Sequence, residues 1–307
     1  MLGENTIKKL NSVGSKRVFV QIPEGLKTRA KRISDFLEDV GFMPFISIEP
    51  CFGACDLRDT DAERLGCDTI LHVGHSDFGV ESRLPVVYEE WRVEFDPVTL
   101  LEKNLDKFSV YETVGLASSI QYIGSLEKAK RFLESRGKKT VTGKAGNLRE
   151  GQVLGCDFTA AATVDGDVDC FLFIGSGDFH ASGLASHVKK PVFFLDAETE
   201  TFERVYPDKK SEIKSALRIE KARGLKKFAV YVSTKPGQMK ADIAVKIKND
   251  LESKGKEAFL ISADMLTPEK ITGMGIEVIV NTACPRIYDD REMFGVVILN
   301  PEDASRL

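Results

Sequence analysis

The feature that most constrains the fold is an order of apolar, β-rich runs and helical segments that returns along the chain. In the first 90 residues, KRVFVQIP, FMPFISIEP, DTILHVGHSDFG and LPVVYEE are strand-like, and helical patterns around residues 26–40 and 56–66 separate the first three. Strands that alternate with helices are typical of parallel pairing in a three-layer α/β unit. The sequence therefore predicts an α/β fold with parallel sheets.

The same order recurs twice more. In the second round the strand-like runs include SVYETVGLASS and DCFLFIGSGDF, with a helical pattern in EKAKRFLESRG. In the third round they include LKKFAVYVSTKPGQ and IEVIVNTACP, with a helical pattern in MKADIAVKIKNDLESKG. A chain of 307 residues is long enough for two or three domains of ordinary size. We expect three pseudo-repeated α/β domains, at residues 1–94, 95–204 and 205–307. Because the chain ends soon after the VVILNP strand, we expect the third of them to be short.

A shared register supports the duplication. Cys55 precedes Gly74 by 19 residues, and Cys156 precedes Gly175 by the same 19 residues. An aspartate follows each cysteine, in GACD and LGCD. Several coincidences in one frame favour a duplicated α/β unit.

The third repeat departs from this frame at the cysteine. Placing Asn281 opposite Gly74 leaves Ser262 opposite Cys55, while Cys284 falls in the neighbouring loop at the end of a strand. Ligands of open α/β sheets gather outside the carboxyl ends of strands. Three such units around a common axis could therefore direct one loop each at a single centre.

Cys55, Cys156 and Cys284 would then supply one thiolate from each repeat. Soft thiolates suit an iron–sulfur cluster or zinc, and three of them leave one coordination position open to another ligand. The separations match no compact motif such as CxxC. The alternative is that cysteines are buried as small hydrophobic residues.

Burial fits Cys67 and Cys170, which lie near the start of a strand in their repeats. Cys51 shares a loop with Cys55 but has Gln152 as its counterpart in the second repeat, so it is the weaker candidate ligand. Among the histidines, His72 fits a core position and His187 a surface position; His75 and His180 are expected at strand ends, where contact with a substrate is one interpretation. These four form the whole histidine complement.

Two loops carry further polar candidates. Lys235 and Gln238, in STKPGQ, either form a plain Pro-Gly turn or direct an amine and an amide at a polar small molecule. Arg286, two residues after Cys284, is either a surface arginine or a bidentate partner for a carboxylate.

Composition excludes several classes of function. No apolar run approaches the roughly 20 residues that span a bilayer, and the N-terminus lacks the apolar core of a secretory signal, so we expect a cytoplasmic protein. Thiols stay reduced there, which argues against a disulfide framework for the six cysteines. A net charge of −4 with interspersed signs offers no basic stripe for nucleic acid.

Five segments together resemble the archaeal diphthamide synthase family, over nearly the whole chain: PEGL, PCFGACD, GQVLGCDFTAA, STKPGQ and NTACPRI. The resemblance implies three α/β domains in a triangle, with one cysteine from each binding a [4Fe–4S] cluster. Carried over by motif, the ligands are Cys55, Cys156 and Cys284.

The implied reaction is transfer of the 3-amino-3-carboxypropyl group of S-adenosylmethionine to C2 of a histidine in translation elongation factor 2. Imidazole C2 is a poor nucleophile, so a carbon radical formed by cleaving the Cγ–S bond would serve, with 5′-methylthioadenosine as co-product. The CxxxCxxC motif of ordinary radical enzymes is absent, because Arg58 takes its third place. The resemblance also implies a homodimer and an external electron donor. With this reaction, we expect the polar small molecule near Lys235, Gln238 and Arg286 to be S-adenosylmethionine.

Three alternatives stay open. Quinolinate synthase also places three cysteines of three α/β domains around a cluster. A three-thiolate zinc site would instead belong to a hydrolase or a structural protein. A non-catalytic subunit that only carries a cluster for a partner is the third.

Overall fold

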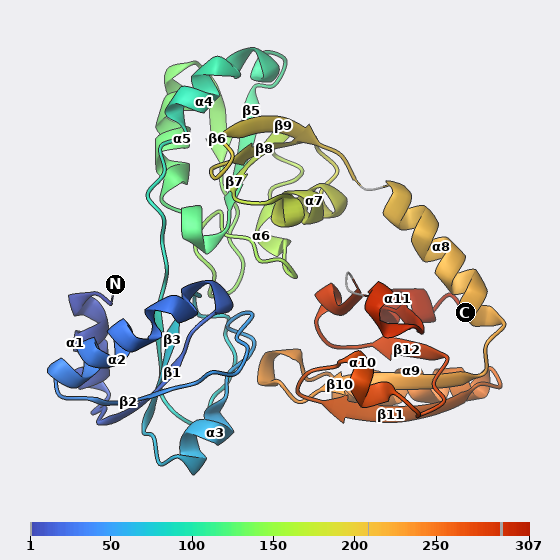
Figure 1. The fold of residues 1–307 in the computed structure, drawn as a ribbon. Helices are drawn as coiled ribbons and strands as arrows, with labels where there is room; N and C mark the ends of the chain where they lie inside the picture. Colours follow the sequence, from blue (N-terminus) through green and yellow to red (C-terminus); the bar gives the residue numbers. More distant parts are fainter. Residues whose placement is uncertain (1, 208, 289–290) are drawn as a thin grey trace. The chain divides into compact units, whose positions relative to one another are not determined.

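The computed structural model describes residues 2–207, 209–288 and 291–307, which form three β-sheets with helices on both faces (Figure 1). Every sheet has the same spatial order of its first four strands, in which the second strand lies outside the first and the third and fourth follow on the other side. The prediction of an α/β fold with three parallel-dominated, repeated sheets is confirmed. Their placement as a triangle stays a prediction.

The three sheets differ in the number and length of their strands. In spatial order, the first sheet contains β2 (Met43–Ile46), β1 (Arg17–Gln21), β3 (Thr69–Val73) and β4 (Val86–Glu89). The second contains β6 (Lys139–Val141), β5 (Thr113–Ser118), β7 (Cys170–Gly175), β8 (Val192–Asp196) and β9 (Thr201–Val205). The third contains β11 (Glu257–Ala263), β10 (Lys227–Ser233), β12 (Val278–Asn281) and β13 (Val297–Leu299).

All neighbouring strands pair in parallel except β8 and β9, which are antiparallel. The central strands β3, β7 and β12 are buried along their whole length. Continuous burial of this kind is typical of parallel strands covered on both faces, since the crossover helices lie on both sides of the sheet.

The α-helices that cover these sheets differ widely in length. They are α1 (Glu4–Ser12), α2 (Ala30–Asp39), α3 (Asp59–Arg64), α4 (Val98–Lys103), α5 (Ser125–Ser135), α6 (Thr159–Ala162), α7 (Asp178–His187), α8 (Lys209–Arg223), α9 (Ala241–Ser253), α10 (Pro268–Ile271) and α11 (Pro301–Ala304). The helical patterns singled out in the sequence correspond to α2, α3, α5 and α9. The elements that were not expected are α1, α4, α6, α7, α8, α10 and α11 and the edge strand β9.

Each sheet has a hydrophobic core on both faces. In the first, α1 and α2 pack on one face through Leu10 and Leu37, and α3 packs on the other through Ala62. In the second, α4 and α5 share a core with β5 and β7, and α6 and α7 cover the opposite face. In the third, α8, α9 and α11 lie on one face and α10 on the other.

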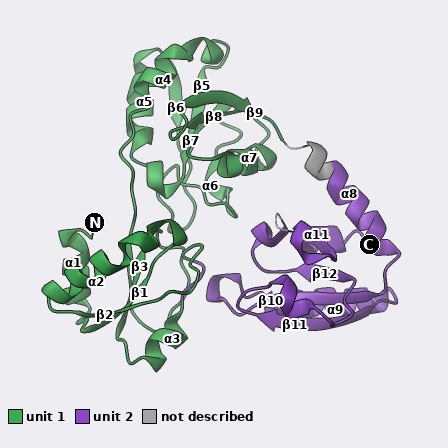
Figure 2. Ribbon diagram, in the orientation of Figure 1, with its two compact units in different colours: residues 1–54, 58–207 green, residues 55–57, 208–307 purple. Residues whose placement is uncertain are grey.

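The chain divides into two compact units (Figure 2). Residues 1–54 and 58–207 form unit 1, and residues 55–57 and 208–307 form unit 2. The first two sheets thus belong to one unit, and the short segment around Cys55 belongs with the third sheet. Division of the chain at 94/95 and 204/205 stays a prediction.

The cysteine loops follow the repeats only in part. Cys55 and Cys156 lie in equivalent connections, after β2 and after β6. Ser262, their expected counterpart, lies inside β11, because the third repeat has a shorter connection between its second strand and the following helix. Cys284 follows β12, as expected.

No helix in the part of the chain that the structure describes is long and apolar enough to cross a membrane.

Candidate metal centre

Solvent access separates the six cysteines into two groups. Cys156 is exposed, and Cys55 and Cys284 are half-buried. The remaining three are buried, with exposed fractions of 2% for Cys51, 5% for Cys67 and 0% for Cys170. The accessible thiols are therefore the three that the sequence predicts as ligands.

Cys55 is held by the 233–238 loop of the third sheet. The backbone N–H of Gly237 donates to the carbonyl oxygen of Cys55 at 2.9 Å, and Nε2 of Gln238 donates to the Cys55 sulfur at 3.4 Å. Lys235 and Asp56 form an ion pair whose side chains are only 4% and 1% exposed. Because charged side chains are buried only when paired, this pair ties the cysteine loop to β10.

Gly237 leaves no space for a side chain, since a Cβ there would lie 2.7 Å from both Cα and Cβ of Cys55. We expect the added methyl group of Gly237→Ala to displace the backbone of Cys55 from the 233–238 loop. The reconstituted protein should then contain less iron. The control is Gly224→Ala, where the nearest atom to an added Cβ is 3.8 Å away. Equal iron content in the two variants would contradict the close approach at Gly237.

Cys284 is positioned by the buried side chain of Asn281, at the end of β12. Its Nδ2 donates to the Cys284 carbonyl at 2.9 Å, and its Oδ1 accepts from the backbone N–H of Ala283 at 3.1 Å. Such bonds replace ladder bonds where a strand ends, so Asn281 shapes the loop that presents the thiol.

The Cys55 and Cys284 thiols interact within unit 2. Burial is the main cause that raises the pKa of the Cys55 thiol, and the charge of Cys284 raises it further. The hydrogen bond from Gln238 acts in the opposite direction. A metal that binds here must therefore displace a proton from Cys55, as is usual for thiolate ligands.

Cys156 projects from a tight turn in unit 1. Leu154 and Asp157 exchange backbone hydrogen bonds of 2.9 and 3.3 Å across the turn. The Asp157 carboxylate then accepts from the backbone N–H of Thr159 at 2.8 Å, at the start of α6. Both aspartates that follow the cysteines thus fix their loops, although by different contacts.

The residues predicted at the S-adenosylmethionine site lie in the same two loops of unit 2. Lys235 is buried and Gln238 half-buried in the loop after β10, and Arg286 is exposed two residues after Cys284. Contact of these side chains with S-adenosylmethionine stays a prediction.

The four histidines occupy different environments. His72 is buried in β3, and His75 is half-buried just after it. His187 is exposed, as predicted. His180 was expected at a strand end and lies instead in α7, because the helix begins only two residues earlier, at Asp178.

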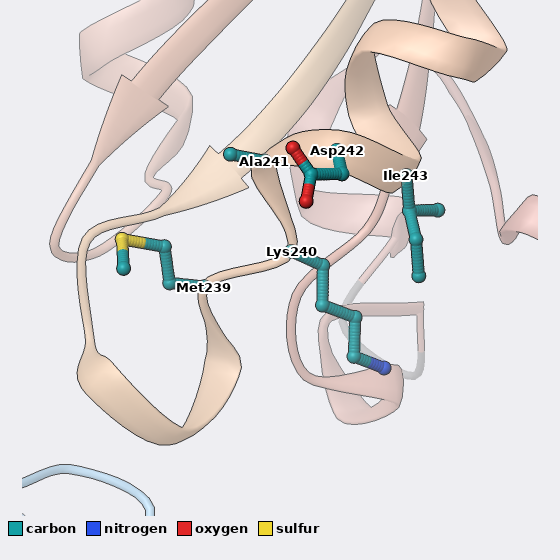
Figure 3. A pocket seen from close by; sticks show the side chains of 5 residues that line it. All are labelled: Met239, Lys240, Ala241, Asp242 and Ile243. Carbon is teal, nitrogen blue, oxygen red and sulfur yellow. The ribbon is translucent and has the colours of Figure 1, made fainter. Parts of the chain in front are cut away.

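A pocket of ≈ 330 Å³ lies at the start of α9. Five consecutive residues, Met239 to Ile243, line it, and Figure 3 shows the Lys240 side chain directed away from Asp242. It contains none of the predicted site residues.

Alkylation rates test the division of the thiols. We expect Cys156 to react first with iodoacetamide and Cys170 last, because Cys170 is fully buried and burial raises the pKa of its thiol to about 12. Peptide mass spectrometry at several times would follow each site, and urea-unfolded protein is the control in which all six should react alike. Rapid labelling of Cys170 in folded protein would contradict the assignment.

The family described as "Putative diphthamide synthesis protein" matches residues 22–306. The chain belongs to this family. Its relative from Pyrococcus horikoshii, "2-(3-amino-3-carboxypropyl)histidine synthase", is 34% identical over 98% of this chain and 88% of its own length. A protein of the same name from Methanocaldococcus jannaschii is 27% identical, over 97% of this chain and 85% of its own length.

Eukaryotic members of the family are longer. This chain covers 66% of subunit 1 of the synthase from Gibberella zeae, at 28% identity over 97% of this chain.

A crystal structure of a family member has the same fold. It is described as Dph2 from Pyrococcus horikoshii with a 4Fe-4S cluster, and it superposes with a TM-score of 0.92 at 33% identity, over 98% of this chain and 89% of the other. Cysteine thiolates are the usual protein ligands of such a cluster.

The sequence did not reveal how the loops around Cys55 and Cys284 are held. In the sequence, Asp56 indicates only that the unit is repeated, and Asn281 is only the position equivalent to Gly74. The recurrence of aspartate after both cysteines was the one available signal of a positioning role.

Proposed function

We propose that this protein is a 2-(3-amino-3-carboxypropyl)histidine synthase that acts on a histidine of translation elongation factor 2. The observation that carries the proposal is the selective accessibility of Cys55, Cys156 and Cys284 in a chain of this family. We further infer S-adenosylmethionine as the donor of the group, a homodimer, an external electron donor and a place in the cytoplasm, where thiols stay reduced.

The overall reaction balances without net oxidation. The Cγ–S bond of S-adenosylmethionine breaks, a C–C bond forms at imidazole C2, and the proton of C2 leaves. The products are the substituted histidine, 5′-methylthioadenosine and one proton.

In this proposal Cys55, Cys156 and Cys284 hold a [4Fe–4S] cluster. When bound and reduced, such a cluster would lend one electron for cleavage of the Cγ–S bond and take it back when imidazole C2 loses its proton, so the electron is not consumed. Gln238 donates to the Cys55 sulfur, and the Lys235–Asp56 pair keeps the Cys55 loop on the third sheet. Hydrogen bonds of this kind tune the potential of iron–sulfur clusters.

We infer that the loops around Lys235 and Arg286 also bind the donor. The exposed Arg286 guanidinium suits the methionine carboxylate, because a guanidinium pairs with a carboxylate through two hydrogen bonds. Lys235 has three donor positions, so pairing with Asp56 is compatible with a second acceptor.

The test is an anaerobic assay of the reconstituted protein with dithionite and S-adenosylmethionine labelled in the transferred group, with and without elongation factor 2. We expect label on the factor and release of 5′-methylthioadenosine. An iron-loaded protein that gives neither product would favour a cluster carrier or quinolinate-synthase chemistry. A protein that binds zinc but no iron would favour the zinc alternative.

Gln238→Leu separates two roles of that side chain. If Gln238 positions the Cys55 thiolate, loss of its hydrogen bond should lower the reduction potential of the cluster. The turnover number of the transfer reaction should then fall by about 10- to 100-fold, as is usual when a group that supports a metal ligand is removed. If it contacts S-adenosylmethionine instead, KM for that substrate should rise at an unchanged potential. Potentiometric titration followed by electron paramagnetic resonance would decide.

A further inference from the structure

We propose that Cys51, His72 and His75 form a second metal site, which takes Zn²⁺ or a similar borderline divalent ion. One ligand atom from each of the three residues lies within 4.8 Å of both others. The Cys51 sulfur is 3.8 Å from Nε2 of His72, and this nitrogen is 3.0 Å from Nδ1 of His75. None of the three is among the predicted cluster ligands, so the inference does not rest on the proposed function.

The separations suit tetrahedral zinc. Bonds of about 2.3 Å to sulfur and about 2.0–2.1 Å to nitrogen place tetrahedral ligands about 3.6 Å apart for a sulfur–nitrogen pair and about 3.3 Å apart for two nitrogens. The observed 3.8 and 3.0 Å differ from these by a few tenths of an ångström. The third pair, the Cys51 sulfur and Nδ1 of His75, lies within 4.8 Å, so side-chain rotations that bring these two atoms to about 3.6 Å would complete the site.

The first sheet builds this group. His72 lies in β3 and packs against Tyr88 of the neighbouring β4, with 5.6 Å between the ring centroids. His75 follows three residues later, just past the strand, and Cys51 comes from the connection after β2. Cys51 and His72 are 2% and 0% exposed, so their positions are set by packing.

The protonation state of the histidines suits a metal. Burial lowers the pKa of His72 to about 3 and that of His75 to about 4. Both imidazoles are therefore neutral near pH 7, and neutral imidazole is the form that binds metals.

The donor set selects the class of ion. One thiolate and two imidazoles suit zinc or another late transition ion, whereas magnesium and calcium prefer oxygen ligands. Three protein ligands leave a fourth tetrahedral position for water or a small ligand.

The experiment is a zinc titration of the full chain that carries Cys55→Ala, Cys156→Ala and Cys284→Ala, so that no cluster ligands compete. We expect one zinc per chain after gel filtration, and with Co²⁺ the absorption of tetrahedral cobalt bound to thiolate. Adding His75→Asn should weaken zinc binding by at least about 100-fold, because even a lost supporting contact costs about 10- to 100-fold. Adding Cys67→Ala, at another buried thiol, should leave it unchanged.

His75→Asn is chosen because His75 is only half-buried, and circular dichroism would check that the variant is folded. If the triple variant does not fold, the same zinc and iron analysis on wild-type protein with a reconstituted cluster replaces it, with His75→Asn alone as comparison. Absence of bound zinc, or zinc retained equally after His75→Asn, would overturn the proposal and leave a hydrogen-bonded histidine pair beside a buried thiol.

Discussion

Cys55→Ala, Cys156→Ala and Cys284→Ala should each reduce cluster absorbance and the release of 5′-methylthioadenosine to background. The proposed cluster needs all three thiolates. The other three cysteines are buried and cannot replace a lost ligand: Cys51, Cys67 and Cys170. Anaerobic reconstitution followed by iron and sulfide analysis would measure the loss directly.

The controls are Cys67→Ala and Cys170→Ala, which remove buried thiols from the cores of the first and second sheets. These variants should keep the cluster and lose only about 1–2 kcal/mol of unfolding free energy, since they leave a small cavity. Cluster loss in the controls equal to that in the first three variants would overturn the ligand assignment.

Asp56→Ala should lower the free energy of unfolding of the cluster-free protein by about 3–5 kcal/mol, because it leaves the Lys235 ammonium buried without its carboxylate partner. The side chains of the pair are only 4% and 1% exposed, so solvent cannot replace the lost contact. Guanidinium unfolding followed by circular dichroism would measure the change.

The double variant Asp56→Asn with Lys235→Met removes both charges and should recover most of the loss, as replacement of a whole buried pair often does. Lys254→Met is the matched control, because Lys254 and Asp250 form an exposed pair of 2.9 Å in the same unit. Lys254→Met should lower the free energy of unfolding by less than about 1 kcal/mol. If Asp56→Ala costs no more than this control, the buried pair does not hold the Cys55 loop.

The local pattern was enough to place most strands. Strands β1, β3, β7, β10 and β12 could be recognised from the sequence. Each is formed by a largely apolar run that lies between polar or glycine-containing segments. Helix α7 was missed because its sequence, DFHASGLASH, shows no clear amphipathic period. Helix α8 and strand β9 alternate charged and apolar residues too irregularly to be separated from loops.

The sequence by itself determined the repeated α/β order. It also gave the candidate ligands, through the shared register of Cys55 and Cys156 and the position of Cys284 after a strand of the third repeat. Only the tertiary structure decided which distant side chains meet. Lys235 and Asp56 pair across 179 residues, and Cys51 meets His72 across 21. Periodicity specifies which face of an element is buried, but contacts between elements depend on strand order and loop length, and neither leaves a signal in the local pattern.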